Sequence, residues 1–132
     1  MKLAAETRFM VHLDSNYLVD ALVPGSSAEA MILSWLAARE TLAMSAVAWG
    51  EFLFGPLSSS AESAARQTVT TIESLQQGDG EQAAKLFNQT GRRSRIFQDC
   101  MIAAAAIRCR ARLATLNTAD FVPFVPYGLT IA

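Results

Sequence analysis

The sequence predicts an α/β fold in which helices alternate with the strands of a parallel sheet. Short, mostly apolar runs such as 9–13 alternate along the chain with longer segments of helical periodicity. Strands that alternate with helices imply crossover connections, which make the strands parallel. The chain is also 52% hydrophobic and only 17% charged. This composition is consistent with a sheet covered on both faces or with a large subunit interface. Because the strand runs are short, a helix bundle stays open as the alternative.

The first half of the chain predicts two strands and three helices. Pro24-Gly25 stops the first helix, and serines offer side chains that cap the next two. The expected elements are a strand at 9–13, a helix at 15–22, a helix from Ser26 or Ser27 through Ala38, a strand at 41–44, and a helix capped by Ser45 that runs through Phe54.

The second half predicts a polar region followed by an apolar helix and two strands. Gly78 and Gly80 indicate a loop. Because segment 70–80 is polar, it is open whether it contributes a strand, so the sheet is expected to have four or five strands. The expected elements are a helix at 61–72, a weak strand near 72–75, a helix at 81–88, an Ala-rich helix at 99–110, and strands at 113–116 and 129–131. At 132 residues, we expect 1–132 to form a single domain.

Four acidic residues are expected at one edge of this sheet. Ligands of open parallel sheets bind at the carboxyl ends of the strands. Asp14 directly follows the first strand, and Asp120 lies just beyond the fourth. Asp99 opens the helix that leads into the fourth strand, and Glu51 lies about a turn and a half into the helix after the second strand. Carboxylates from distant parts of the chain can thus converge.

Convergent carboxylates repel one another, so they must raise their pKa values or hold a cation. A set of oxygen ligands without Cys or His favours Mg²⁺ or Mn²⁺ over zinc. Such an ion binds phosphate and can supply an activated water. The expected chemistry is therefore hydrolysis of a phosphodiester.

The charge balance is nearly even, with 11 basic and 12 acidic residues, so the chain lacks the basic excess typical of nucleic-acid binding proteins. Arg92, Arg93 and Arg95 are weak candidates for contacts with an RNA backbone. Cys100 and Cys109 lack zinc-ligand spacing and are expected to be reduced thiols. Without a signal peptide or a membrane-spanning run, we expect a cytoplasmic protein.

The segments LDSNYLVDAL, SAVAWGEFLFG, FQDCMIAAAAI and LATLNTADF, in this order and spacing, resemble the PIN domain family. The likeness is greatest to the VapC-like toxins of bacterial toxin–antitoxin pairs, and it covers nearly the whole chain. The resemblance implies an α/β/α sandwich with a parallel sheet of four or five strands. It also implies a ribonuclease that depends on Mg²⁺ or Mn²⁺, commonly forms a homodimer, and binds a small antitoxin protein.

Carried over to this sequence, the resemblance assigns metal binding and catalysis to four carboxylates. Asp14, Glu51, Asp99 and Asp120 match the acidic residues of the four motifs in turn. Asn16, Thr115 and Asn117 match polar positions that support the ligands or orient water.

Each of these residues also has a purely structural interpretation. Asp14 and Asp99 could be helix caps, and Asp120 could begin a turn. Glu51 stands among aromatic residues, where a carboxylate is costly unless it is paired or binds metal. A lone His12 is more often a packed or hydrogen-bonded residue than a catalytic base.

Two other functional classes remain open at this point. A catalytically inactive interaction module would keep the fold and bind only a partner. A receiver or phosphatase-like phosphoryl-transfer domain also places aspartates at the carboxyl edge of a sheet. This class is disfavoured because Asn16 stands where such a phosphatase has Asp, and because Lys2 and Lys85 are not placed on a late strand.

Overall fold

The computed structural model describes residues 10–91 and 97–132. Within them, a five-stranded sheet has the order β3-β2-β1-β4-β5, and every neighbouring pair is parallel. The strands are β1 (Met10–Leu13), β2 (Thr41–Ser45), β3 (Thr71–Glu73), β4 (Arg112–Ala114) and β5 (Thr130–Ile131). The predicted α/β class is confirmed, and the sheet has five strands rather than four.

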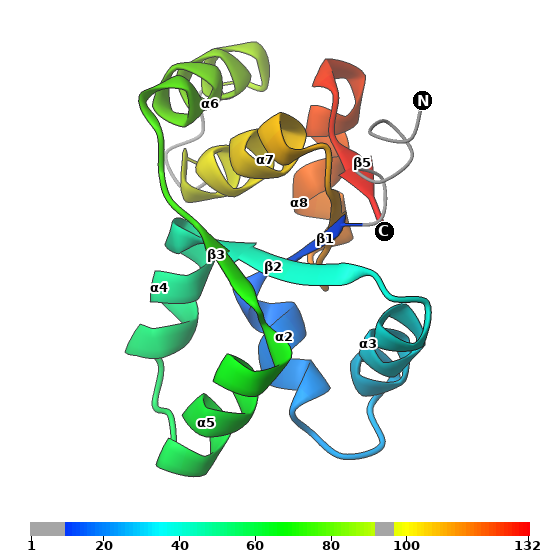
Figure 1. The fold of residues 1–132 in the computed structure, drawn as a ribbon. Helices are drawn as coiled ribbons and strands as arrows, with labels where there is room; N and C mark the ends of the chain where they lie inside the picture. Colours follow the sequence, from blue (N-terminus) through cyan, green and yellow to red (C-terminus); the bar gives the residue numbers. More distant parts are fainter. Residues whose placement is uncertain (1–9, 92–96) are drawn as a thin grey trace.

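Helices cover both faces of this sheet, which gives the α/β/α sandwich expected from the sequence. The helices are α2 (Ser15–Ala21), α3 (Ser27–Ala37), α4 (Ala46–Phe54), α5 (Ser59–Thr68), α6 (Gln77–Gln89), α7 (Phe97–Cys109) and α8 (Thr118–Phe121), with a 3-10 helix η2 (Val122–Tyr127). Helices α6 and α7 lie on one side of the sheet, and α2 to α5 lie on the other (Figure 1). No helix in the described ranges is long and apolar enough to cross a membrane.

The core lies on both faces of the central strands. The side chains of Val11, Leu13, Leu42, Met44 and Leu113 are all at most 1% exposed. This burial explains why the strand sequences are continuous apolar runs rather than alternating ones. The alanines of α7, at 103–106, are equally buried, and their small size lets this helix pack closely against α6 and the sheet.

Serine caps fix the starts of α3 and α4. The Ser26 and Ser45 side chains accept hydrogen bonds from the N–H groups of Glu29 (3.0 Å) and Ala48 (3.1 Å). These contacts satisfy N–H groups that have no partner within the helix. The predicted starts of α3 and α4 are therefore confirmed.

The helix predicted at 61–72 is misplaced. Helix α5 begins at Ser59, because the Ser58 hydroxyl accepts a hydrogen bond from the Ala61 N–H (3.1 Å), and it ends at Thr68. The chain then becomes extended and forms β3, which begins one residue before the predicted weak strand. This strand is polar because it is an edge strand and only partly buried.

The loop predicted around Gly78 and Gly80 is wrong, because both glycines lie inside the first turn of α6. The Asp79 carboxylate accepts a hydrogen bond from the Gln76 N–H (3.0 Å), which fixes this helix start. Arg108 of α7 donates two hydrogen bonds to the same carboxylate, at 2.8 and 3.1 Å. The start of α6 thus depends on a contact with a residue 29 positions along the chain.

Candidate active site

Two adjacent strands bring Asp14 and Thr115 together at the carboxyl edge of the sheet. Leu13 of β1 is in register with Ala114 of β4, and the Asp14 N–H continues this pairing by donating to the Ala114 carbonyl (2.9 Å). The Thr115 hydroxyl then donates to Asp14 Oδ2 (2.8 Å) and accepts from the Asn117 N–H (3.0 Å). Residues 101 positions apart are therefore held in direct contact.

This contact lies where the chain reverses its direction across the sheet. From β1 the chain moves outward to β2 and β3, and it then returns to the other side of β1 to form β4 and β5. Connections on the two sides of such a point run to opposite faces, which opens a crevice at the carboxyl ends of the strands. Asp14 occupies this position, and it is only 4% exposed.

Asp14 also caps α2, so its structural and candidate catalytic roles coexist. Its Oδ1 accepts a hydrogen bond from the Ser15 N–H (2.9 Å), while Oδ2 is bound by Thr115. A carboxylate can accept about four hydrogen bonds or ligand contacts. Each oxygen of Asp14 therefore retains acceptor capacity.

Glu51 reaches the same edge from α4, the helix that directly follows β2. Helices α2 and α4 pack against each other. The Ser15 hydroxyl at the start of α2 donates to Glu51 Oε1 (3.4 Å). The long side chain of Glu51 is thus turned back toward Asp14, as its place in the helix predicted.

Asp99 and Asp120 approach from the C-terminal part of the chain. Asp99 lies in the first turn of α7 and is half-buried. Asp120 lies in the single turn of α8 and is exposed, and its N–H donates to the Asn117 carbonyl (2.9 Å). Helices α7 and α8 contact each other, so these two carboxylates come near the end of β1 from the side of β4.

The carboxylates act on one another electrostatically. Burial raises the pKa of Asp99 to about 6, and the negative charges of Asp14, Asp120 and Glu51 contribute to the rise. Burial likewise raises the pKa of Asp14, although the hydrogen bonds from Thr115 and Ser15 oppose the change. The pKa of Glu51 rises through burial and through the charge of Asp14.

This donor set consists of carboxylate oxygens, which suit a hard divalent cation. As the side chains lie, no group of three His, Cys, Asp or Glu in the described ranges is arranged to hold a metal ion. The charges of these carboxylates thus help to raise the pKa values of Asp14, Glu51 and Asp99, but the four side chains are not gathered into a ligand shell. Their shared negative charge fits a cation, and side-chain rotation is needed to close around one.

Several predicted site residues stand apart from the four carboxylates. Asn16 is exposed on α2, and no hydrogen bond within the described part joins it to them. Asn117 is exposed and contributes through its backbone to Thr115 and Asp120. The arginines at 92, 93 and 95 lie outside the described residues. The contacts of Ser15 with Asp14 and Glu51 were not predicted from the sequence. The only indication in the sequence was that Ser15 directly follows Asp14.

His12 belongs to a different environment. Its side chain is 1% exposed, and neither ring nitrogen has a hydrogen-bond partner among the described residues. Burial lowers the pKa of His12 to about 4, and its charged neighbours are Glu73, Arg108 and Asp79 rather than the site carboxylates. The residue is packed, as the sequence favoured, but the described part of the chain gives it no hydrogen bond.

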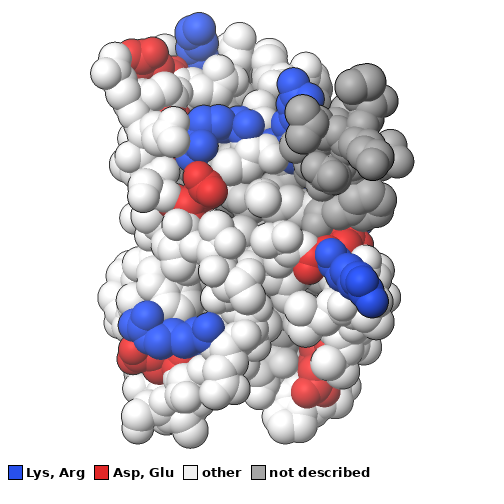
Figure 2. Space-filling view, in the orientation of Figure 1, with Lys and Arg blue, Asp and Glu red and all other residues white. Residues whose placement is uncertain are grey.

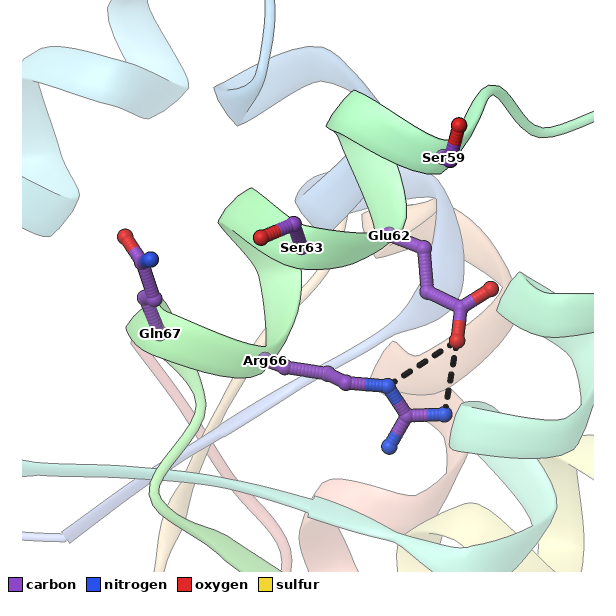
Figure 3. A pocket seen from close by; sticks show the side chains of 5 residues that line it. All are labelled: Ser59, Glu62, Ser63, Arg66 and Gln67. Carbon is purple, nitrogen blue, oxygen red and sulfur yellow. Dashed lines mark hydrogen bonds and ion pairs between the residues drawn. The ribbon is translucent and has the colours of Figure 1, made fainter.

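A polar hollow of about 390 Å³ lies on α5, away from the carboxylates. It is lined by Ser59, Glu62, Ser63, Arg66 and Gln67 (Figure 3). The Arg66 guanidinium turns along the helix to bind Glu62 Oε2 (2.9 and 2.8 Å) and also lies over the Trp49 ring, 5.2 Å from its centroid. Because Arg66 is held by its own chain, this hollow is not a second anion site.

Comparison with known proteins identifies a family and a shared fold. The model of the PIN domain family matches residues 11–122, which include all four carboxylates. No curated protein sequence matches the chain significantly.

Among solved structures, a toxin–antitoxin complex from Klebsiella pneumoniae is similar at 24% identity and a TM-score of 0.69, over 85% of this chain and 90% of that chain. VapBC2 from Rickettsia felis, solved with a DNA fragment from its promoter, gives 20% identity and a TM-score of 0.71 over 93% and 97% of the two chains. FitAcB from Neisseria gonorrhoeae has 20% sequence identity and a TM-score of 0.70, again over 93% of this chain and 97% of that chain.

Proposed function

Because this chain belongs to the PIN domain family, we propose that it is a metal-dependent endoribonuclease and the toxin of a toxin–antitoxin pair. The observation that carries the proposal is the mutual electrostatic coupling of four carboxylates at the carboxyl edge of the sheet. Such coupling disfavours the folded protein unless it serves to bind positive charge.

The proposed cofactor is Mg²⁺ or Mn²⁺, held by Asp14, Glu51, Asp99 and Asp120. When bound by these residues, a divalent cation would supply an activated water and neutralise charge on the scissile phosphate. Thr115 keeps Asp14 in place through the 2.8 Å hydrogen bond. Burial and the charges of Asp14, Asp120 and Glu51 raise the pKa of Asp99, and a bound cation would stabilise the charged form of this carboxylate.

The proposed reaction is hydrolysis of an RNA phosphodiester. The oxygen of water forms a new bond to phosphorus, and the bond from phosphorus to the 3′-oxygen breaks. One proton of the water passes to a carboxylate or to solvent, and the 3′-oxygen takes up a proton as it leaves. The products carry a 5′-phosphate and a 3′-hydroxyl.

The proposed partners are an antitoxin protein and a second copy of the chain. Support comes from the similar solved structures, which include toxin–antitoxin complexes. Large apolar side chains remain exposed, among them Val19, Val23, Leu33 and Phe54, and exposed apolar surface favours association. Cellular RNA as the substrate places the proposed activity in the cytoplasm.

The test is cleavage of a total cellular RNA pool by the purified chain with Mg²⁺, with Mn²⁺ and with EDTA. Asp14→Asn and Asp99→Asn serve as site variants. Asn can still cap a helix, so Asp14→Asn removes a ligand charge with little change to α2. Discrete cuts that need metal and disappear in both variants are the expected result.

A catalytically inactive binding module is the second candidate. The absence of a closed three-residue ligand group within the described ranges favours it. Well-folded protein that leaves RNA intact with either metal would support this module and contradict the nuclease. Cleavage that persists in EDTA or in Asp14→Asn would contradict the proposed site.

A further inference from the structure

Ser15 contacts both carboxylates that come from the N-terminal half of the chain. Its N–H donates to Asp14 Oδ1 (2.9 Å), and its hydroxyl donates to Glu51 Oε1 (3.4 Å). Ser15 is the first residue of α2. Its two hydrogen bonds go to Asp14, which follows β1, and to Glu51, which lies in α4. Ser15 therefore joins the end of β1 to the middle of α4.

Glu51 needs such a contact more than Asp14 does. Asp14 is buried and is held on the other side by Thr115, so its position is fixed without the Ser15 hydroxyl. Glu51 has a longer side chain with several rotatable bonds, and fixing a glutamate costs about 1.5–2 kcal/mol of rotamer entropy. Within the described residues, the Ser15 hydroxyl is the hydrogen-bond donor that the structure gives to the Glu51 carboxylate.

The backbone and side chain of Ser15 have separable roles. The cap on α2 uses the Ser15 N–H, which any residue except proline supplies. The contact with Glu51 uses the hydroxyl alone. A change from serine to alanine thus removes the second contact and leaves the first.

We propose that Ser15 is a positioning residue whose hydroxyl orients Glu51 beside Asp14 and so prepares the site for a divalent cation. This inference rests on the proposed function. Residues that orient metal ligands typically contribute about 10- to 100-fold in metal affinity. Because the 3.4 Å bond is long and the ligand itself is retained, we expect an effect near the lower end of that range.

The experiment is calorimetric titration of the purified chain with Mn²⁺ alone, which needs no RNA. Ser15→Ala should weaken Mn²⁺ binding by about 10-fold. Ser15→Thr keeps the hydroxyl and should bind within about threefold of the unaltered chain by the same reasoning. Ser34→Ala, on the exposed face of α3, is the matched control and should leave binding unchanged.

A double variant separates orientation of Glu51 from a general structural effect. If Ser15 acts through Glu51, Ser15→Ala should add no further loss to Glu51→Gln, because coupled changes are not additive. Thermal unfolding of each variant checks that the fold is retained. An additive loss in the double variant would overturn the proposed route through Glu51.

The remaining outcomes distinguish this inference from the nuclease proposal. If Ser15→Ala binds Mn²⁺ as tightly as the unaltered chain, and both cleave RNA, the inference fails and the nuclease stands. If the unaltered chain binds no Mn²⁺ and cleaves no RNA, both fail.

Discussion

The Asp99 carboxylate lies in a position that disfavours its charged form. Its pKa in the folded protein is about 6, against an ordinary value of 3.8, so the folded state holds this proton more tightly than the unfolded state does. The contribution of Asp99 to the free energy of unfolding therefore falls as pH rises from about 4 to about 6, and it stays low above that range. At neutral pH, Asp99 weakens the metal-free fold.

Asp99→Asn should stabilise the protein in EDTA near neutral pH. We expect a gain of about 1 kcal/mol, which is less than the full pKa shift implies because the side chain is half-exposed. Urea unfolding near pH 7.5 and near pH 4 measures this gain, which should vanish at the lower pH. Added Mn²⁺ should stabilise the unaltered chain more than the variant. Equal stability of the two chains at both pH values would contradict the prediction.

His12 should make the fold sensitive to acid. Its pKa is about 4 in the folded state and 6.5 ordinarily, so the unfolded state binds more protons between these values. The contribution of His12 to the free energy of unfolding is then lost as pH falls from about 6.5 to about 4, by up to about 3 kcal/mol. His12→Phe, which cannot titrate, should show a smaller loss over this range in chemical unfolding. A pH profile identical to that of the unaltered chain would show that other groups cause the acid sensitivity.

Among the elements, α6 depends on one arginine of α7. Arg108 binds Asp79, which is 1% exposed, and also contacts Glu73 of β3 (3.3 Å). The hydrogen bond to Arg108 lowers the pKa of Asp79 against the effect of burial. One guanidinium thus joins β3, the first turn of α6 and the last turn of α7.

Arg108→Met should cost about 3 kcal/mol in the free energy of unfolding, because it leaves a buried carboxylate without its partner. Arg66→Met breaks an exposed pair within α5 and should cost no more than about 1 kcal/mol. Urea unfolding of both variants measures the difference. Asp79→Asn combined with Arg108→Met should recover part of the loss, and equal costs for the two arginines would contradict this account.

The same elements show what the sequence could predict. Ser26 and Ser45 cap helices through contacts within three residues, so local patterns sufficed for α3 and α4. The start of α6 depends on Arg108, which local patterns do not reveal, and two glycines pointed instead to a loop. The single turn α8 and the 3-10 helix η2 were not predicted, because they are short and the latter contains Pro126.

The candidate site was more predictable than these boundaries. Alternation of strands and helices was enough to place Asp14, Glu51, Asp99 and Asp120 at one edge, and their electrostatic coupling agrees with that placement. Side-chain contacts were not predictable. The hydroxyl of Ser15 and the burial of His12 follow from packing between elements that lie far apart in sequence.

Over the whole molecule, charge is balanced within the chain itself. The net charge is −1, and three arginines pair with its own acidic residues: Arg66 with Glu62, Arg108 with Asp79, and Arg112 with Glu40. Figure 2 shows basic side chains in separate places among acidic and uncharged surface. Within the described ranges, these ion pairs leave Arg39, Lys85 and Arg110 as the basic side chains available to phosphates.

RNA binding should therefore depend only weakly on salt. With one to three phosphate contacts on a single-stranded RNA, affinity should fall by about 3- to 20-fold between about 50 and 200 mM salt. Fluorescence anisotropy of a labelled RNA with Asp99→Asn, which should not cleave it, measures the slope. A loss of about 1,000-fold would indicate six or more phosphate contacts and would contradict this expectation.

The central position of β1 also determines when the proposed site can assemble during synthesis. Asp14 is made early, but its partner Thr115 lies 101 residues later, and Asp120 follows still later. A ribosome that has not released the last part of the chain carries an incomplete set of carboxylates, with β1 unpaired on one side. The proposed nuclease would in this way stay harmless to the ribosome and message that are producing it until Asp120 has left the ribosome.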